Sequence, residues 1–312
     1  MTTAIVLGAN GQDGSHLCEL LAREGRAVVG VGRQPAYRHP APAGSFRYEP
    51  ADLGDAAAVD RLLDRHAADQ IYHVAAVHGH AGVSLDARFD EACAVNVTAL
   101  HRALEHARRG GGRCRVFYAS SAKVFGPLTG RVTLDTPRAG RCLYGLTKRT
   151  AGELAAHYRT AHGIGTTVAL LFNHESPRRP PEFFIPKICG MVAAACRDPG
   201  FRGRVDTLSF CCDWSSAADL MALAVQAVDR GVDGELLFAS GTTLDARPFV
   251  RRLFARYGLD AERHVAAGPE RPYPRFEVDL SDTVRRLDVR PQQTIFDVCD
   301  RIIALAARRM AA

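Results

Sequence analysis

The feature that most constrains this chain is a short apolar strand that runs into a glycine-rich turn near its start. Residues Ala4–Leu7 are apolar, and Gly8, Gly11 and Gly14 follow with the spacing G-x-x-G-x-x-G. Gly8 permits a tight turn, Gly11 lets the backbone approach a phosphate, and Gly14 lets a helix pack closely on the strand. A helix that begins here points N–H groups at a pyrophosphate. The pattern therefore predicts a dinucleotide-binding turn.

Strand-like and helix-like segments alternate through the first half of the chain. We expect strands at Ala27–Gly32, Phe46–Glu49, Gln70–Ala76, Arg115–Ser120 and Thr166–Phe172. We expect helices at Ala56–His66, Asp90–Ala107 and Tyr144–His162. This alternation predicts an α/β fold of the Rossmann type, a doubly wound parallel sheet with helices on both faces.

The pattern changes after Phe172, where the rigid segment Pro177–Pro181 precedes shorter elements. We predict a Rossmann domain that binds the dinucleotide over residues 1–172, to which part of residues 209–240 returns. A smaller α/β domain, mainly for substrate binding, is expected over residues 173–312. It should close over the carboxyl edge of the sheet, where α/β folds bind ligands.

Composition narrows the class of protein. The 312 residues hold nine scattered cysteines without a C-x-x-C pair, and we expect reduced thiols in the cytoplasm rather than disulfides or a metal site. No apolar run is long enough to span a membrane, and we expect no signal peptide. The net charge of +6 favours phosphorylated ligands, but aromatic residues do not interleave with basic ones, so nucleic acid is not an expected partner.

The second strand indicates which dinucleotide binds. An acid at its end usually bonds the ribose 2′-OH of NAD, but Gly32 stands there and Arg33 follows. Arg33 can pair with a 2′-phosphate, so we expect NADP rather than NAD, although Arg33 can also be an ordinary surface residue. Asp52, after the third strand, either accepts a bond from the adenine amino group or caps the next helix.

A catalytic pattern follows the fifth strand. Tyr144 and Lys148 lie at i and i+4 on one helix face, and Ser120 and Ser121 end the strand before them. A lysine ammonium near a phenol lowers the pKa of the tyrosine. That tyrosine can move a proton at a carbinol while hydride moves to or from nicotinamide, and a serine hydroxyl can hold the same oxygen.

With these motifs the chain resembles the extended short-chain dehydrogenase/reductases, the nucleotide-sugar epimerases and dehydratases, and most closely the GDP-mannose 4,6-dehydratases. The resemblance covers nearly the whole length and is most specific in Gly8–Ser15 and Leu171–Arg179, while Cys212–Trp214 is similar to that family's Arg-Asp-Trp. The family uses NADP, in agreement with Gly32 and Arg33.

The resemblance implies roles for individual residues. Tyr144 would move the proton with Lys148 as its partner, Ser121 would hold the sugar C4 oxygen, and Asn173 would lie beside nicotinamide or the sugar diphosphate. The expected cofactor site comprises Gly8, Asn10, Gly11, Gln12, Asp13, Gly14, Arg33, Asp52, Leu53, Ala75, Ala76, Asn96, Tyr144, Lys148, Phe172, His174 and Arg178. The expected substrate site comprises His78, Ser121, Asn173, Lys187, Arg204 and Arg271.

The chain departs from the family at its elimination machinery. Family dehydratases carry a glutamate, which removes the sugar C5 proton, where this chain has Lys123. A lysine is normally protonated at neutral pH and is no base unless it is desolvated. The family's threonine and serine nearby become Ser121 and Ala122, and the arginine before Asp-Trp becomes Cys212. We keep Lys123 in the expected catalytic set, with a substrate contact or a loop-shaping ion pair as its alternatives.

Other polar residues carry weaker signals. His78-Gly79-His80 could be a metal pair, a substrate loop or a loop without a role; we expect no metal. Glu175 could replace the missing base or order its own loop. Arg271 matches a position that often clamps the substrate diphosphate, whereas Lys187 and Arg204 are more simply read as surface charges.

Assembly follows from the resemblance as well. Related folds pair through the Tyr-x-x-x-Lys helix and the helix before the fifth strand, and Ala151, Leu154, Ala155 and Ala156 offer small apolar surface. We expect a homodimer. A tetramer is not expected, because Gln34–Pro40 replaces the loop that the family uses for tetramer formation.

The function expected from the sequence is NADP-dependent hydride transfer at C4 of a nucleotide-diphosphate sugar, as 4-keto reduction or epimerisation. One alternative keeps the dehydration, with Lys123, a histidine or Glu175 as base. Another is a sensor or scaffold that binds NADP without catalysis, against which the intact set Ser121, Tyr144 and Lys148 argues.

Overall fold

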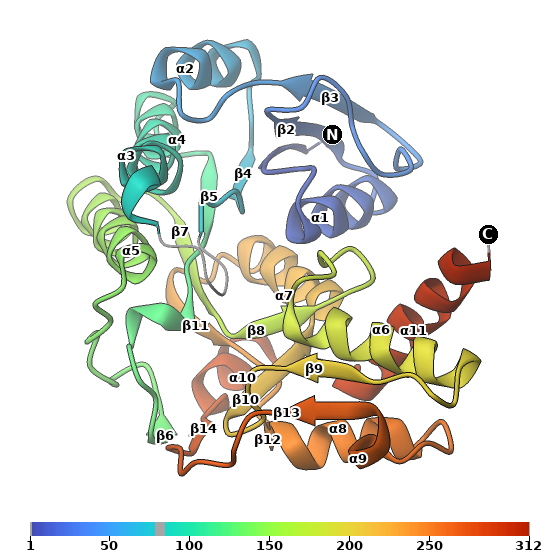
Figure 1. The fold of residues 1–312 in the computed structure, drawn as a ribbon. Helices are drawn as coiled ribbons and strands as arrows, with labels where there is room; N and C mark the ends of the chain where they lie inside the picture. Colours follow the sequence, from blue (N-terminus) through green and yellow to red (C-terminus); the bar gives the residue numbers. More distant parts are fainter. Residues whose placement is uncertain (1, 79–84, 312) are drawn as a thin grey trace.

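Seven parallel strands form the central sheet of the computed structural model, which describes residues 2–78 and 85–311 (Figure 1). Their order is β11-β7-β5-β4-β1-β2-β3. The strands are β1 (Thr3–Leu7), β2 (Ala27–Gly32), β3 (Phe46–Pro50), β4 (Gln70–His73), β5 (Arg115–Ala119), β7 (Thr166–Leu171) and β11 (Gly234–Phe238). The order reverses direction at β1, as in Rossmann-type sheets. The predicted α/β fold class is therefore confirmed.

Helices cover both faces of the sheet because both faces are apolar. In β1, Ile5 and Leu7 face one core while Ala4 and Val6 face the other. Such an alternation places successive side chains on opposite faces. The helices on the Ile5 face are α2 (Ala56–Arg65), α3 (Phe89–Cys93), α4 (Ala99–Arg109) and α5 (Leu143–His162). Those on the other face are α1 (Gln12–Arg23) and α7 (Ala217–Asp229).

The segment expected as one helix over Asp90–Ala107 is interrupted. Between α3 and α4 lies a π-helical turn, Ala94–Thr98. It places Asn96 in the interior, where its Nδ2 donates to the Val77 carbonyl and to Thr147 Oγ1 and its Oδ1 accepts from the Val77 N–H. Such turns add a residue to a helix and commonly occur at functional sites. Apolar periodicity alone gave no signal of this interruption.

The second half of the chain forms a smaller lobe, seen at the bottom of Figure 1. Strands β8 (Asn173–Glu175), β10 (Cys211–Ser216) and β12 (Thr243–Asp245) form a three-stranded sheet. Two-stranded sheets pair β9 (Gly203–Val205) with β13 (Val265–Ala267) and β6 (Gly130–Val132) with β14 (Phe276–Val278). The helices are α6 (Phe184–Arg197), α8 (Ala246–Ala255), α9 (Ala261–His264), α10 (Ser281–Leu287) and α11 (Ile295–Ala311). Trp214 stacks on Phe184 in its core, with ring centroids 5.6 Å apart.

The chain returns from this lobe to the central sheet. Helix α7 packs against the sheet, and β11 pairs with β7 in parallel. Both lie within the 209–240 segment, although the domain boundaries themselves stay a prediction. Strand β8, directly after β7, carries the chain out of the large sheet and begins the smaller one.

The helix expected to pair two subunits has part of its small apolar surface inside its own subunit. Ala151 and Ala155 of α5 are fully buried in the core shared with α4, and Leu154 packs against it. The expectation that Ala151 and Ala155 offer surface to a second subunit is therefore wrong. The homodimer itself stays a prediction.

Two findings bear on the class of protein. All nine cysteines are free thiols. Over the residues that the structure describes, none of the helices is both long and apolar enough to cross a membrane.

We expect Gly14→Ala to destabilise the fold, because a Cβ on Gly14 would lie 2.1 Å from the Gly8 carbonyl oxygen. Overpacking of this kind costs on the order of 1–3 kcal/mol. The matched control is Gly190→Ala in helix α6, where nothing lies within 4 Å of the added Cβ and alanine favours the helix by up to about 1 kcal/mol. Urea unfolding of both variants measures the difference, and equal stabilities would contradict the packing argument.

Candidate active site

Three backbone segments converge at the glycine turn. Gly8 has φ +105°, and a Cβ there would lie 2.6 Å from the amide nitrogen of Ala75. Gly11 precedes α1 and, lacking a side chain, leaves the first N–H groups of the helix uncapped. A helix N-terminus with free N–H groups and room in front of it suits a pyrophosphate. The turn and packing roles expected of Gly8 and Gly14 are confirmed, while cofactor binding stays a prediction.

The segment after β2 folds back over Asn10. Asn10 Nδ2 donates to Gln34 Oε1, the Ala36 carbonyl and Tyr48 Oη, each at 3.0 Å. A Cβ on Gly32 would lie 3.0 Å from Tyr48 Oη, so a side chain at this position would have to displace the Tyr48 hydroxyl slightly. Sequence reasoning missed Tyr48, which comes into contact with Asn10 only through the pairing of β2 with β3.

Two residues near this end of the sheet were expected to contact the adenosine half. The Arg33 side chain is 66% exposed, and its Nη1 lies 3.2 Å from Glu91 Oε1. Asp52 Oδ1 accepts from the Gly54 N–H, while the side chain of Asp55 caps α2. The alternative that Asp52 is the N-cap is therefore wrong, because the helix begins three residues later than that alternative requires.

Ser121, Tyr144 and Lys148 come together at the carboxyl end of β5. Tyr144 lies in the first turn of α5, and Ser121 is near enough to its hydroxyl to lower the pKa of Tyr144. Lys148 is 1% exposed; its Nζ donates to the Ala119 carbonyl at 2.6 Å and lies 5.6 Å from the Tyr144 ring centroid. A hydroxyl pair beside a buried amine can hold a carbonyl oxygen and deliver a proton to it.

The pKa values in this group differ from the expected ones. Burial raises the pKa of Tyr144, and the nearby Ser121 hydroxyl offsets this only in part. Burial lowers the pKa of Lys148 to about 7, against an opposing effect of the charge on Asp13. The expectation that Lys148 lowers the pKa of Tyr144 is therefore wrong for this structure. The physical reason is that Lys148 Nζ points to a backbone carbonyl, and desolvation disfavours its own charge.

Lys123 lies in a loop whose backbone is fixed. Ser121 Oγ accepts from the Lys123 N–H at 3.2 Å. A Cβ on Gly140 or Gly145 would lie 2.1 or 2.6 Å from the Lys123 carbonyl oxygen, so both glycines are needed for this approach. The side chain is exposed, and its charge acts on the thiol of Cys212 in β10. Lys123 thus lies beside Ser121 and extends toward the smaller lobe.

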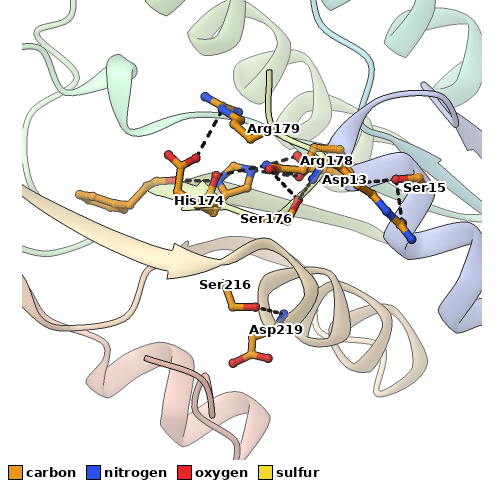
Figure 2. A network of polar contacts seen from close by, with 11 residues as sticks. Asp13, Ser15, His174, Ser176, Arg178, Arg179, Ser216 and Asp219 are labelled. Carbon is orange, nitrogen blue, oxygen red and sulfur yellow. Dashed lines mark hydrogen bonds and ion pairs between the residues drawn. The ribbon is translucent and has the colours of Figure 1, made fainter. Parts of the chain in front are cut away.

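A buried network joins α1 to β8 (Figure 2). His174 Nε2 lies 3.0 and 3.1 Å from the two carboxylate oxygens of Asp13, and His174 Nδ1 lies 2.7 Å from the Phe172 carbonyl. Gln12 donates to the His174 carbonyl and accepts from the Ser176 hydroxyl. Burial opposes both charges, but the pair raises the pKa of His174 and lowers that of Asp13. Protonated His174 therefore donates from both ring nitrogens.

The two arginines after β8 take different directions, as Figure 2 shows. Arg178 donates to Ser15 Oγ at 2.9 Å and to Glu19, both on α1. Arg179 Nε lies 3.8 Å from Glu175 Oε2, and its guanidinium stacks 3.8 Å above the Phe183 ring. Glu175 is 3% exposed, and burial raises its pKa to about 7. Sequence reasoning named Arg178 but missed the roles of Ser176 and Arg179 in this network.

The remaining residues expected at the cofactor site are buried or partly buried. Leu53, Phe172 and Asn96 are buried, and Ala75 and Ala76 are partly buried in the segment after β4. Both amide N–H bonds of Asn96 go to Val77 and Thr147, so its expected direct contact with the cofactor is wrong. Asn96 instead positions the Val77 segment against α5.

The expected substrate residues lie on several exposed elements. His78 is exposed, with its ring centroid 6.1 Å from that of Tyr144, and Asn173 is exposed at the start of β8. Lys187 lies on α6, Arg204 on β9 and Arg271 in the loop after β13, where Ser209 accepts from its N–H. Their binding roles stay predictions. His80 lies outside the described residues.

The described residues contain no group of three or more His, Cys, Asp and Glu side chains that could hold a metal ion. The chemistry available at Ser121, Tyr144 and Lys148 is proton transfer at an oxygen. A nucleotide cofactor bound at the glycine turn would supply the electrons for an oxidation or reduction.

Comparisons of the sequence with known proteins identify GDP-mannose 4,6-dehydratases as relatives. Residues 5–293 match the family described as GDP-mannose 4,6 dehydratase. A GDP-mannose 4,6-dehydratase of Sordaria araneosa is 30% identical over 269 residues, which cover 83% of this chain and 49% of that protein. This chain thus spans about half the length of that relative.

Solved structures show the same fold at lower identity. The dTDP-glucose 4,6-dehydratase of Bacillus anthracis, in complex with NAD, has a TM-score of 0.81 and 17% identity and covers 100% of this chain and 98% of its own. RMD from Pseudomonas aeruginosa, complexed with NADPH, has a TM-score of 0.80 and 18% identity and covers 99% of this chain and 100% of its own.

We expect the stability of the folded protein to depend on pH through Lys148. Its pKa is 10.5 when exposed and about 7 in the fold, so between these values the unfolded chain holds a proton that the folded one has released. Stability therefore rises with pH in this window, by at most about 1.4 kcal/mol per pH unit.

Urea unfolding at pH 7 and 9.5 measures this effect. Lys148→Met should lose the rise that the unmodified protein shows, whereas Lys187→Met, at an exposed lysine, should keep it. The same rise in Lys148→Met would assign the pH dependence to another group.

Proposed function

Because the chain belongs to the GDP-mannose 4,6-dehydratase family, we propose that it is an NADP-dependent enzyme that transfers hydride at C4 of a nucleotide-diphosphate sugar. The net reaction is 4-keto reduction or epimerisation. One observation carries this proposal: Ser121 acts on the hydroxyl of Tyr144 beside buried Lys148, while Lys123, whose N–H donates to Ser121 Oγ, stands next to them in place of a carboxylate.

The residues present suit a nicotinamide dinucleotide. The uncapped start of α1 and the close approach of Gly8 to Ala75 leave backbone N–H groups for a pyrophosphate. When bound, the nicotinamide ring supplies or accepts the hydride. In the reductive direction Tyr144 donates its proton to the carbonyl oxygen and Ser121 donates a hydrogen bond to the same oxygen. The high pKa of Tyr144 suits a group that must hold this proton until the hydride arrives.

Lys123 argues against elimination as the net reaction. Its side chain is exposed, and it is not the carboxylate that family dehydratases are expected to use as the base. One observation favours the dehydration alternative: Glu175, with a pKa raised to about 7, has the ionisation behaviour of a general base. Glu175 is nevertheless buried and faces Arg179, which favours a role in ordering its loop.

The preference for NADP rests on Arg33. Its present ion pair with Glu91 is exposed, and such pairs are worth about 0–1 kcal/mol. A charged hydrogen bond to a 2′-phosphate is worth about 1.5–3 kcal/mol, so Arg33 gains by leaving Glu91.

We therefore expect NADPH to bind at least about tenfold more tightly than NADH in a fluorescence titration. Arg33→Ala should remove most of this preference. Arg88→Ala, which removes the other arginine on Glu91, should retain it. Equal affinities of the unmodified protein for both cofactors would refute the NADP assignment.

The reaction itself is tested by product analysis. The protein is incubated with NADPH and a panel of nucleotide sugars and their 4-keto-6-deoxy forms, and the products are identified by mass spectrometry. We expect reduction or epimerisation of at least one compound. Tyr144→Phe should abolish turnover and leave NADPH binding largely unchanged.

With GDP-mannose as substrate we expect no useful dehydration, because loss of a general base lowers a rate by about 10²–10⁴-fold. Lys123→Glu should restore part of this activity, and Lys123→Gln serves as the control that removes the charge without supplying a base. Efficient dehydration by the unmodified protein would overturn the argument from Lys123, and its loss in Glu175→Gln would identify the base.

A further inference from the structure

A cavity lies beside helix α5, which carries Tyr144 and Lys148. It has a volume of about 650 Å³ and lies between α5, the segment Leu134–Arg138 and the strands β7 and β11. Ser120 and Lys148 belong to its wall, whereas Ser121 and Tyr144 do not. A volume of this size falls in the range of small-molecule sites. The cavity is therefore large enough for a ligand and is distinct from the glycine turn.

Helix α5 contributes one face of the cavity. Arg149, Gly152, Ala156 and Arg159 line the cavity and follow one another by three or four residues, which places them on one face of α5. A Cβ on Gly152 would have Glu235 Oε1 as its nearest neighbour, at 3.7 Å. Two small residues in the middle and an arginine at each end thus make a groove, and at one end Arg149 Nε lies 3.6 Å from Glu153 Oε1.

Two further arginines come from other elements and are held in place. Arg138 donates to Glu235 Oε2 at 2.6 Å and stacks 4.5 Å above the Phe125 ring. Arg286 of α10 donates to the backbone carbonyls of Asp233 and Glu235, and its Nη1 lies 3.5 Å from Asp282 Oδ2. These contacts hold Arg286 beside the cavity, and Asp282 offsets part of its charge.

The charges and the apolar wall together indicate the ligand class. The lining holds four arginines, Arg138, Arg149, Arg159 and Arg286, against three acidic side chains, those of Asp135, Glu153 and Glu235. Val124, Leu134 and Val168 add an apolar surface. A cavity of this composition attracts anions and also buries an apolar body.

We propose that this cavity is a binding site for an organic anion with an apolar body, separate from the nucleotide-sugar site. Ser120 and Lys148 separate the cavity from Tyr144. Ser120 Oγ lies 3.5 Å from the Lys148 carbonyl oxygen, and Lys148 Nζ lies 5.6 Å from the centroid of the Tyr144 ring. Occupation of the cavity therefore changes the rate of hydride transfer, a part of the proposal that rests on the proposed function.

Binding is tested with the fluorescent anion 8-anilinonaphthalene-1-sulfonate. Saturating NADP⁺ and GDP keep the probe out of the cofactor and nucleotide-sugar sites. We expect one saturable site per chain. N-phenyl-1-naphthylamine, which has the same rings without the sulfonate, should bind at least about tenfold more weakly, as expected for the loss of a charged hydrogen bond.

Matched variants locate the site. Gly152→Leu fills the cavity and should abolish binding, and Arg159→Ala should weaken it about tenfold. Thr150→Leu, on an exposed part of α5, and Arg301→Ala, at an exposed arginine of α11, should bind as the unmodified protein does. Equal probe affinity in all five proteins would overturn the binding site, and so would equal affinity for the charged and the neutral probe.

The coupling is tested by the rate of NADPH oxidation with a saturating sugar substrate. The sulfonate probe should change kcat in the unmodified protein and not in Gly152→Leu. An unchanged kcat at saturating probe would overturn the coupling. If no substrate turns over, the proposed function fails, and the binding measurements still decide whether the site exists.

Discussion

The ion pair between Asp13 and His174 joins the two halves of this protein. Asp13 lies in the first turn of α1, directly behind the glycine turn, and His174 lies in β8, where the chain leaves the large sheet. Their side chains are 17% and 12% exposed, so each charge alone would be costly there. Each charge is stabilised by the other, and the pair holds β8 against the glycine turn. Asn173, the residue before His174, lies at the start of the strand that this contact holds.

Local sequence patterns predict part of this structure, and contacts between distant residues determine the rest. The strands were predictable because both sheet faces are buried, which produces apolar runs such as Ala4–Leu7, and the glycine turn and the Tyr144–Lys148 spacing are local patterns. The π-helical turn at Asn96 was not predictable, since it depends on bonds to Val77 and Thr147, which the fold alone brings near. The pKa directions of Tyr144 and Lys148 were also beyond the sequence, because they are set by burial.

The loop that carries Lys123 is predictable only in part. Its position follows from the motif around it, but the close packing of its backbone against Gly140 and Gly145 does not. Gly140 and Gly145 are distant from Lys123 in sequence, and both would clash with its carbonyl if they had a side chain. The backbone of Lys123 is therefore held beside Ser121 by its packing against these two glycines and by the hydrogen bond to Ser121 Oγ. A lysine where the family is expected to carry a glutamate changes the charge beside Ser121 from negative to positive.

The contacts of α10 with β11 have a consequence for the protein in a crowded solution. β11 is the last strand on its side of the sheet, and the outer edge of such a strand can recruit a strand from another chain. Here Arg286 donates to the carbonyls of Asp233 and Glu235, and Thr283 donates to that of Leu237. The acceptors that a foreign strand would need are already engaged. The same arginine that adds charge to the cavity thereby protects the sheet against edge-to-edge aggregation.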